Sequence, residues 1–263
     1  MPEIVSVSRR TDVPAFFWDE FLNILRRGKA VSRNPFNGRE KEVSLRRDDV
    51  LLFVFWTKNP SRLVRDLPRL LGKGYRCVVH VTVNGYPPVI EKSIPPASDV
   101  ASSLRALSRI LGREKVFWRF DPLLPGESPD ETLQRFQAIA DLIGESAGRI
   151  YTSAYQPYRK TLGRLEKAGV DPRGPVSLEA AFKVREEARR RGIPLFSCCS
   201  PLLSEAGIAQ GACIDGEYLS KIFPDVKIDK RNNPTREGCL CTDSRDIGFY
   251  RTCRGGCIYC YAS

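Results

Sequence analysis

The stretch Arg76-Cys-Val-Val-His-Val-Thr-Val-Asn84 has the composition of a buried strand with two different faces. Successive side chains of a strand point to opposite sides. One side carries Cys77 and the valines at 79, 81 and 83, which are apolar and suit a layer of helices. The other side carries His80, Thr82 and Asn84, which suit the interior of a barrel. The stretch therefore predicts a sheet with helices on one face and polar side chains on the other.

Apolar runs alternate with amphipathic helical stretches along the chain, which indicates βαβ units and a mostly parallel sheet. The expected strands are Ile4–Ser8, Val50–Thr57, Arg76–Asn84, Lys115–Phe120, Arg149–Ala154, Pro194–Cys198 and Ile247–Tyr250. Strands in this number predict an α/β fold, namely a complete or partial (β/α) TIM-like barrel. Between the first two strands, Asn37-Gly38 predicts a hairpin of Ala30–Arg33 with Glu42–Leu45.

Helix starts are marked by residues that can cap a first turn. Ser128-Pro-Asp-Glu131 has the spacing of a capping box. Ser98 and Ser177 can cap the helices that follow them, and Asn59 before Pro60 is typical of a cap followed by proline in the first turn.

Length and composition predict a globular protein with one barrel and a small appendage. The chain has 263 residues, of which 42% are hydrophobic. We expect a barrel body over residues 1–200 and a cysteine-rich segment over residues 201–263 that carries metal ligands and a closing strand. No apolar run is long enough to span a membrane, and the N-terminus lacks the order of a signal peptide. We therefore expect a cytoplasmic location without membrane attachment.

The net charge is +11, because 42 Lys and Arg face 31 Asp and Glu. The basic residues are spread along the chain, and several lie beside acids on expected helices. One interpretation is a solvated surface, and the other is affinity for an anionic partner such as nucleic acid or a phosphorylated metabolite. Charge alone leaves both open.

Nine cysteines in a chain expected to be cytoplasmic indicate metal or redox chemistry rather than disulfides. The spacing of Cys253, Cys257 and Cys260 is CxxxCxxC, only three residues from the end of the sequence. Three thiolates on so short a loop can hold three irons of a [4Fe–4S] cluster. The fourth iron then lacks a protein ligand and can bind a substrate or cofactor, so this motif predicts chemistry rather than electron storage.

This loop resembles the cluster motif of the radical SAM enzymes, and Tyr259 matches the aromatic or apolar residue usual there. The resemblance implies that the open iron binds S-adenosylmethionine, which an electron then cleaves to methionine and a 5′-deoxyadenosyl radical. Typical members carry the motif after their first strand. We therefore expect a circularly permuted barrel, in which Ile247–Tyr250 lies beside Ile4–Ser8 and brings the loop to the carboxyl-terminal rim.

Over nearly its full length the chain also resembles a bacterial and archaeal family of unknown function, noted for a radical-SAM-like cysteine cluster at its C-terminus. The matching residues are Ser8-Arg-Arg-Thr-Asp12, Phe55-Trp-Thr-Lys-Asn-Pro60, Trp118-Arg-Phe-Asp-Pro122, and Cys239-Leu-Cys241 through Asp246-Ile-Gly to Cys260-Tyr-Ala262. This resemblance supports the cofactor and leaves the substrate unnamed.

The remaining clustered cysteines can form a second metal site. Cys239 and Cys241 make a CxC pair, and Cys213 and one of the pair 198–199 lie in the same C-terminal region. Four such thiolates can hold a second [4Fe–4S] cluster or a structural zinc, or remain unligated. The resemblance favours Cys198 over its neighbour. Cys77 is expected to be a core residue.

Polar side chains at the carboxyl ends of the expected strands are the candidate site, because barrel enzymes place their chemistry there. The catalytic candidates are Arg10, Lys58, His80, Arg119, Asp121 and Ser153. The candidate cofactor contacts are Tyr259, Lys58, Asn59 and Arg10. We expect Lys58, His80, Arg119 and Asp121 to ring the open iron. Alternatives remain open: His80 as a hydrogen-bonded core residue, Arg119 with Asp121 as a structural pair, and Asn59 as a helix cap.

The sequence thus predicts a radical SAM enzyme supplied with electrons by a reductase or by a flavodoxin or ferredoxin. A second hypothesis is an iron–sulfur redox, electron-transfer or sensor protein without SAM chemistry. A third is a zinc-stabilised nucleic-acid-binding protein, which the net charge favours and the barrel pattern does not.

Overall fold

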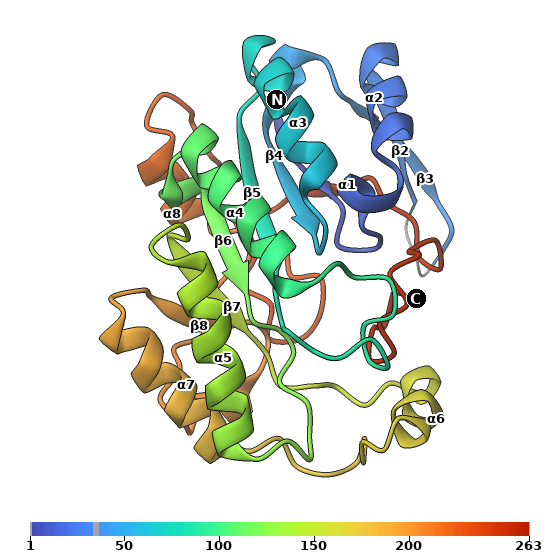
Figure 1. The fold of residues 1–263 in the computed structure, drawn as a ribbon. Helices are drawn as coiled ribbons and strands as arrows, with labels where there is room; N and C mark the ends of the chain where they lie inside the picture. Colours follow the sequence, from blue (N-terminus) through green and yellow to red (C-terminus); the bar gives the residue numbers. More distant parts are fainter. Residues whose placement is uncertain (1, 34–36, 263) are drawn as a thin grey trace.

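A parallel sheet of seven strands forms the centre of the computed structural model, which describes residues 2–33 and 37–262 (Figure 1). From edge to edge its order is β8 (Leu195–Ser197), β7 (Arg149–Thr152), β6 (Val116–Arg119), β5 (Cys77–Thr82), β4 (Val50–Thr57), β1 (Glu3–Val7) and β9 (Arg245–Asp246). Every neighbouring pair is parallel. The α/β class is therefore confirmed. Barrel closure is not shown, since β8 and β9 are the two edges of this sheet in the described part of the chain.

Helices cover one face of the sheet (Figure 1). They are α3 (Ser61–Gly72), α4 (Ala97–Leu111), α5 (Pro129–Ile143) and α7 (Leu178–Arg190). Cys77, Val79 and Val81 of β5 belong to the core under these helices, as the alternation predicted. Burial raises the pKa of Cys77, as befits a core thiol.

The opposite face is covered by the irregular C-terminal segment and its short helix α8 (Gly216–Ile222) (Figure 1). Val54 and Val78 of the sheet pack there with Ile214 and Leu219 of that segment. Five cysteines share this second core, and they are Cys198, Cys199, Cys213, Cys239 and Cys241. The cysteine-rich segment thus covers the face of the sheet opposite the helices.

The expected strands agree with the observed ones to within about two residues at each end, apart from the last. Ile247–Tyr250 is wrong as a strand, because β9 comprises Arg245–Asp246. Val5 pairs with Arg245 and Ser6 with Asp246, so the last strand does lie beside the first, as expected. The ladder stops there because the Asp246 side chain accepts hydrogen bonds that hold the following turn, including one of 3.0 Å from the Gly248 amide.

The first crossover is elaborated by two helices and a hairpin. Helices α1 (Val13–Phe16) and α2 (Trp18–Arg27) precede the antiparallel strands β2 (Lys29–Arg33) and β3 (Glu40–Ser44), which confirms the predicted hairpin. The remaining described elements are α6 (Arg159–Lys167) and the 3₁₀ turns η1 (Arg47–Asp49), η2 (Arg113–Lys115) and η3 (Pro201–Ser204). No helix in the described ranges is long and apolar enough to cross a membrane.

The helix caps follow local chemistry in part. Ser128 forms the predicted capping box, and Ser177 accepts a hydrogen bond from the Ala180 amide. Ser98 is wrong as a cap, because α4 already begins at Ala97 after Pro96. Asn59 precedes the cap position of α3 by one residue, and its Oδ1 accepts hydrogen bonds from the amide and hydroxyl of Ser61.

Replacing Asp246 with Ala should lower the free energy of unfolding by about 2–4 kcal/mol, because it leaves several buried donors unpaired. Ser6 Oγ, Ser8 Oγ and the Arg9 amide all donate to this carboxylate. Urea denaturation measures the change. Asp229→Ala, which removes an exposed carboxylate paired only with Arg231 nearby, is the control and should have a much smaller effect. Equal effects of the two substitutions would contradict this account of β9.

Candidate functional site

The terminal cysteine loop lies against the loop that follows β5 (Figure 1). Glu91 and Cys257 form an antiparallel bridge, and the Ser93 amide donates to the Gly255 carbonyl at 3.1 Å. On the other side, Tyr261 donates to the carbonyl of Arg9, just beyond β1. Because the strands are parallel, both contacts lie at the carboxyl edge of the sheet. The structure therefore brings the CxxxCxxC loop to the edge where α/β enzymes carry their sites.

The three terminal thiols lie within one small region. A Cβ at Gly255 would sit 3.6 Å from Cys253 Sγ and 3.7 Å from Cys257 Sγ, so both sulfurs lie beside this glycine. The Ala262 amide donates to Cys260 Sγ at 3.3 Å. Burial raises the pKa of Cys257 to about 12; the Lys58 ammonium lowers it, while the other two thiols raise it further. The Lys58 ammonium is thus the nearby positive charge that favours the Cys257 thiolate.

A buried polar network supports this loop from behind. Lys58 Nζ lies 2.8 Å from Glu91 Oε1, and Asn84 Nδ2 donates to the same oxygen at 2.9 Å. Tyr259 also donates its hydroxyl proton to Glu91. Burial alone would raise the pKa of Glu91, but the nearby Lys58 ammonium holds it below its usual value. The hydrogen bonds of Glu91 and Asn84 thus fix the position of Tyr259, which lies between Cys257 and Cys260 in the sequence.

Asp121 and Ser153 belong to the same network. Asn84 Nδ2 donates to the Asp121 carbonyl at 2.8 Å, and the Asp121 amide donates back to Asn84 Oδ1 at 2.7 Å. Ser153 donates to one Asp121 carboxylate oxygen, and Arg119 Nη2 lies 2.7 Å from the other. Five of the predicted site residues are therefore joined through Asn84 and Glu91, and they are Lys58, Arg119, Asp121, Ser153 and Tyr259.

His80 and Arg119 face the other cysteines rather than the terminal loop. His80 Nε2 lies 2.9 Å from the Cys213 carbonyl, and its ring stacks on Trp56 with centroids 4.1 Å apart. Burial, helped by the Arg119 charge, places the pKa of His80 well below its usual value, so the ring is neutral. Arg119 Nη1 lies 3.2 Å from Cys213 Sγ.

The five interior cysteines form a compact group. Cys213 Sγ lies 2.9 Å from Cys198 Sγ, which is 3.9 Å from Cys199 Sγ. The Ile214 amide points to Cys241 Sγ at 3.5 Å. Cys239 and Cys241 are buried like the others. Among the residues that the structure describes, no group of His, Cys, Asp or Glu side chains is arranged around a single metal ion.

In the described part of the chain, Arg10 and Asn59 contact residues other than the terminal cysteines. Arg10 donates to the Arg33 carbonyl at 2.6 Å and its guanidinium lies over the Tyr250 ring. Asn59 is engaged with Ser61 at the start of α3. The structure thus assigns both to local bracing.

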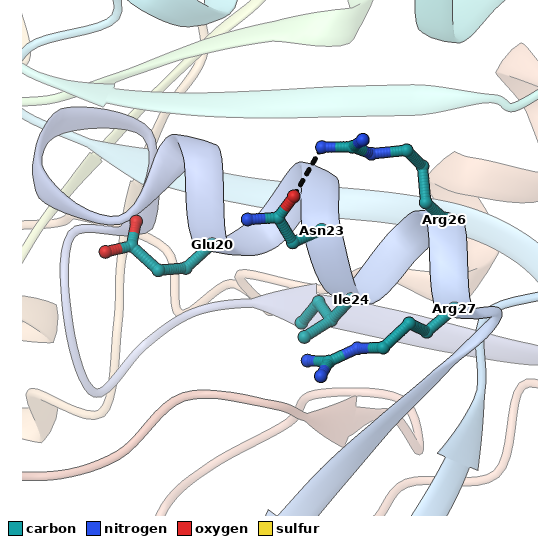
Figure 2. Close-up of a pocket in the computed structure, with 5 residues that line it drawn as sticks. All are labelled: Glu20, Asn23, Ile24, Arg26 and Arg27. Atoms are coloured by element: carbon teal, nitrogen blue, oxygen red, sulfur yellow. Dashed lines mark hydrogen bonds between the residues drawn. The ribbon is translucent and has the colours of Figure 1, made fainter.

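One of two surface pockets lies beside the terminal loop, and the other lies on α2. One of about 710 Å³ adjoins the terminal loop and is lined by Arg10, Arg33, Asn37, Gly38, Lys160, Phe249, Tyr250, Arg251 and Tyr261. The other, of about 470 Å³, lies on the outer surface of α2, where Figure 2 shows its lining residues. None of the candidate site residues lines the α2 pocket.

Sequence reasoning missed Glu91, the acceptor at the centre of the network. It lies in a proline-rich loop outside any motif, and a lone acid in such a loop is a weak signal. The Ser8-Arg-Arg-Thr-Asp12 motif contains Arg9, but only Arg10 was named there as a site residue. The Arg9 side chain donates to Ser244 Oγ at 2.9 Å and lies over the Trp56 ring, close to the interior cysteines.

The fold and the site define an α/β protein with two groups of cysteines, one at the carboxyl edge of the sheet and one inside it. The chain belongs to a family described as a domain of unknown function (DUF1848), whose model matches residues 4–262. No curated protein matches it.

Replacing Glu91 with Ala should destabilise the protein by about 3–5 kcal/mol, because the buried Lys58 ammonium loses its partner. Thermal and urea unfolding measure this effect. Glu42→Ala breaks an exposed ion pair with Lys29 and is the matched control, with little expected change. If the Glu91 variant were as stable as the control, the network would not hold the loop.

Asp12 predicts a specific pH dependence of stability. Burial raises the pKa of Asp12 from 3.8 to about 6, against hydrogen bonds that include one of 2.7 Å from the Lys58 amide. The unfolded chain therefore loses this proton at lower pH than the folded protein. Between about pH 4 and pH 6 the wild type should lose about 2–3 kcal/mol relative to Asp12→Asn, with no further loss above pH 7. Urea midpoints across this range measure the difference, and parallel profiles would contradict it.

Proposed function

We propose that this protein is a radical SAM enzyme whose [4Fe–4S] cluster is held by Cys253, Cys257 and Cys260. The observation that carries the proposal is the position of the CxxxCxxC loop, which lies at the carboxyl edge of a parallel sheet against the loop that follows β5. Held by these three cysteines, such a cluster would bind S-adenosylmethionine and supply the electron for its reductive cleavage.

The permuted arrangement follows from the sheet order. In typical members, the cluster loop follows the first strand. Here β9 runs parallel to β1 at the edge of the sheet, and the terminal loop follows β9. The loop consequently reaches the same edge as the ends of β1, β4, β5 and β6, although it comes last in the sequence.

The residues around the loop suit this role. The Lys58 ammonium lies near Cys257 and offsets the negative charge of a thiolate-bound cluster. Glu91 and Asn84 hold Tyr259 between two ligands of that cluster. Asp121 and Ser153 follow β6 and β7 at the same edge, where they can orient a substrate. Asn59 then acts indirectly, by positioning the segment after β4, whereas Arg10 lines the pocket beside the loop.

The pocket beside the loop supports an anionic substrate. Four of its residues are basic, namely Arg10, Arg33, Lys160 and Arg251. Phe249 and Tyr250 are 42% and 39% exposed, so their rings are accessible to an unsaturated or aromatic group. We place the protein in the cytoplasm, because thiolate-held clusters need the reducing conditions of that compartment. A flavodoxin or ferredoxin would supply the electron.

The decisive experiment is a SAM cleavage assay on anaerobically reconstituted protein. The wild type should release 5′-deoxyadenosine in the presence of dithionite, and Cys257→Ala should reduce this release to background. Cys77→Ala removes a buried thiol far from the loop in sequence and is the matched control, with activity retained.

Two other outcomes would favour the other hypotheses. A reduced cluster whose EPR signal is unchanged by S-adenosylmethionine would indicate a redox or sensor protein. Zinc without iron or sulfide would indicate a zinc-stabilised protein, for which salt-dependent binding to nucleic acid is the next measurement.

A further inference from the structure

We propose that the interior cysteines form a second iron–sulfur site, with Cys198, Cys213, Cys239 and Cys241 as its ligands. This site is separate from the terminal loop and does not depend on the proposed SAM chemistry. The four residues come from three segments, which are the end of β8, the loop before α8 and the CxC pair before β9.

The fold brings these segments together on the interior face of the sheet. The four side chains have exposed fractions of only 3–7%, so the thiols are shielded from solvent. Cys213 Sγ lies 2.9 Å from Cys198 Sγ, and Cys241 Sγ faces the Ile214 amide at 3.5 Å. Thr235 donates its hydroxyl proton toward Cys239 Sγ at 3.6 Å. Peptide and hydroxyl donors around sulfur are the outer contacts that tune iron–sulfur centres.

Guanidinium groups surround the same thiols. Arg119 Nη1 lies 3.2 Å from Cys213 Sγ, and Arg236 Nη2 lies 3.9 Å from Cys198 Sγ. Arg9 Nε is buried without a hydrogen-bond partner in the described ranges, although its guanidinium lies over Trp56 beside His80. A buried cation needs an opposite charge. Arg119 has Asp121 as one such partner, and a thiolate-bound cluster would add negative charge beside all three guanidinium groups, whereas neutral thiols would not.

The ligand spacing favours a cluster over structural zinc. Structural zinc sites usually draw ligands from knuckles of the type C-x₂₋₄-C. Here the closest pair is CxC, and Cys198 and Cys213 each stand alone as ligands in the sequence. The segment also packs on the sheet through Ile214 and Leu219, so it does not need a metal to form a core.

A polar path links this group to the terminal loop, which suits a redox centre. It runs from Cys213 Sγ through Arg119 and Asp121 to Asn84. From Asn84 it continues through Glu91 to Lys58, beside Cys257.

Cys198 rather than Cys199 is the assigned ligand because of its contact with Cys213. The two sulfurs lie 2.9 Å apart, and Arg119 also contacts Cys213. Cys199 Sγ lies 3.9 Å from Cys198 Sγ, within the same group. Cys199→Ala should therefore leave the iron content unchanged.

The test is iron, sulfide and zinc analysis of the full chain after anaerobic reconstitution. We expect about eight irons and eight sulfides in the wild type and in Cys77→Ala, since each [4Fe–4S] cluster contributes four of each. Cys239→Ala/Cys241→Ala should retain about four irons, whose EPR signal still responds to S-adenosylmethionine. Cys253→Ala/Cys257→Ala should also retain about four, with no such response.

Full iron content in Cys239→Ala/Cys241→Ala would overturn the second site. So would the finding that this variant loses one zinc ion, and no iron, relative to the wild type. Failure of the proposed function is distinguishable from this, because it removes the response to S-adenosylmethionine in the wild type without changing the iron count.

A second variant tests the site without removing a ligand. Arg236→Gln should keep all the iron but lower the reduction potential of one cluster, because a positive charge near its sulfur is lost. Arg231→Gln, an exposed arginine of the same segment, is the control and should leave both potentials unchanged. Two unchanged potentials in Arg236→Gln would also count against the second site.

Discussion

The carboxylate of Asp246 is the contact on which the placement of the tail depends. It accepts hydrogen bonds from Ser6 Oγ at 2.8 Å and Ser8 Oγ at 2.6 Å, although these residues lie at the opposite end of the sequence. Because Ser6 and Ser8 lie two residues apart near the end of β1, their side chains can reach the same carboxylate. A buried carboxylate needs such donors to offset its desolvation. The final segment therefore leaves the sheet at its carboxyl edge.

The second constraint is the uncovered face of the sheet. Helices protect only one side, so the apolar residues of the other side, such as Val54 and Val78, need a partner. The segment between β8 and β9 provides it and carries all five interior cysteines with it. Packing and chemistry are consequently provided by the same stretch of chain, with Ile214 and Leu219 contributing to the core beside Cys213 and Cys241.

Asn84 connects the two cysteine groups. Its side chain contacts Glu91, Asp121 and Tyr259, and these residues come from separate loops at the edge of the sheet. Each partner is buried or half-buried, so removing one leaves the others unsatisfied. Such a network holds the terminal loop in one position relative to the strand ends, as a site with an open coordination position would require.

The sequence by itself determined the α/β class, most strand positions, the hairpin and the two-faced character of β5, because these depend on alternation and local turn chemistry. It also indicated the CxxxCxxC loop and the interior cysteines. Only the tertiary structure decided that Lys58 pairs with Glu91, that His80 and Arg119 face Cys213, and that β9 ends at Asp246. These outcomes depend on contacts between distant segments, and no local pattern specifies which buried charge will meet which partner.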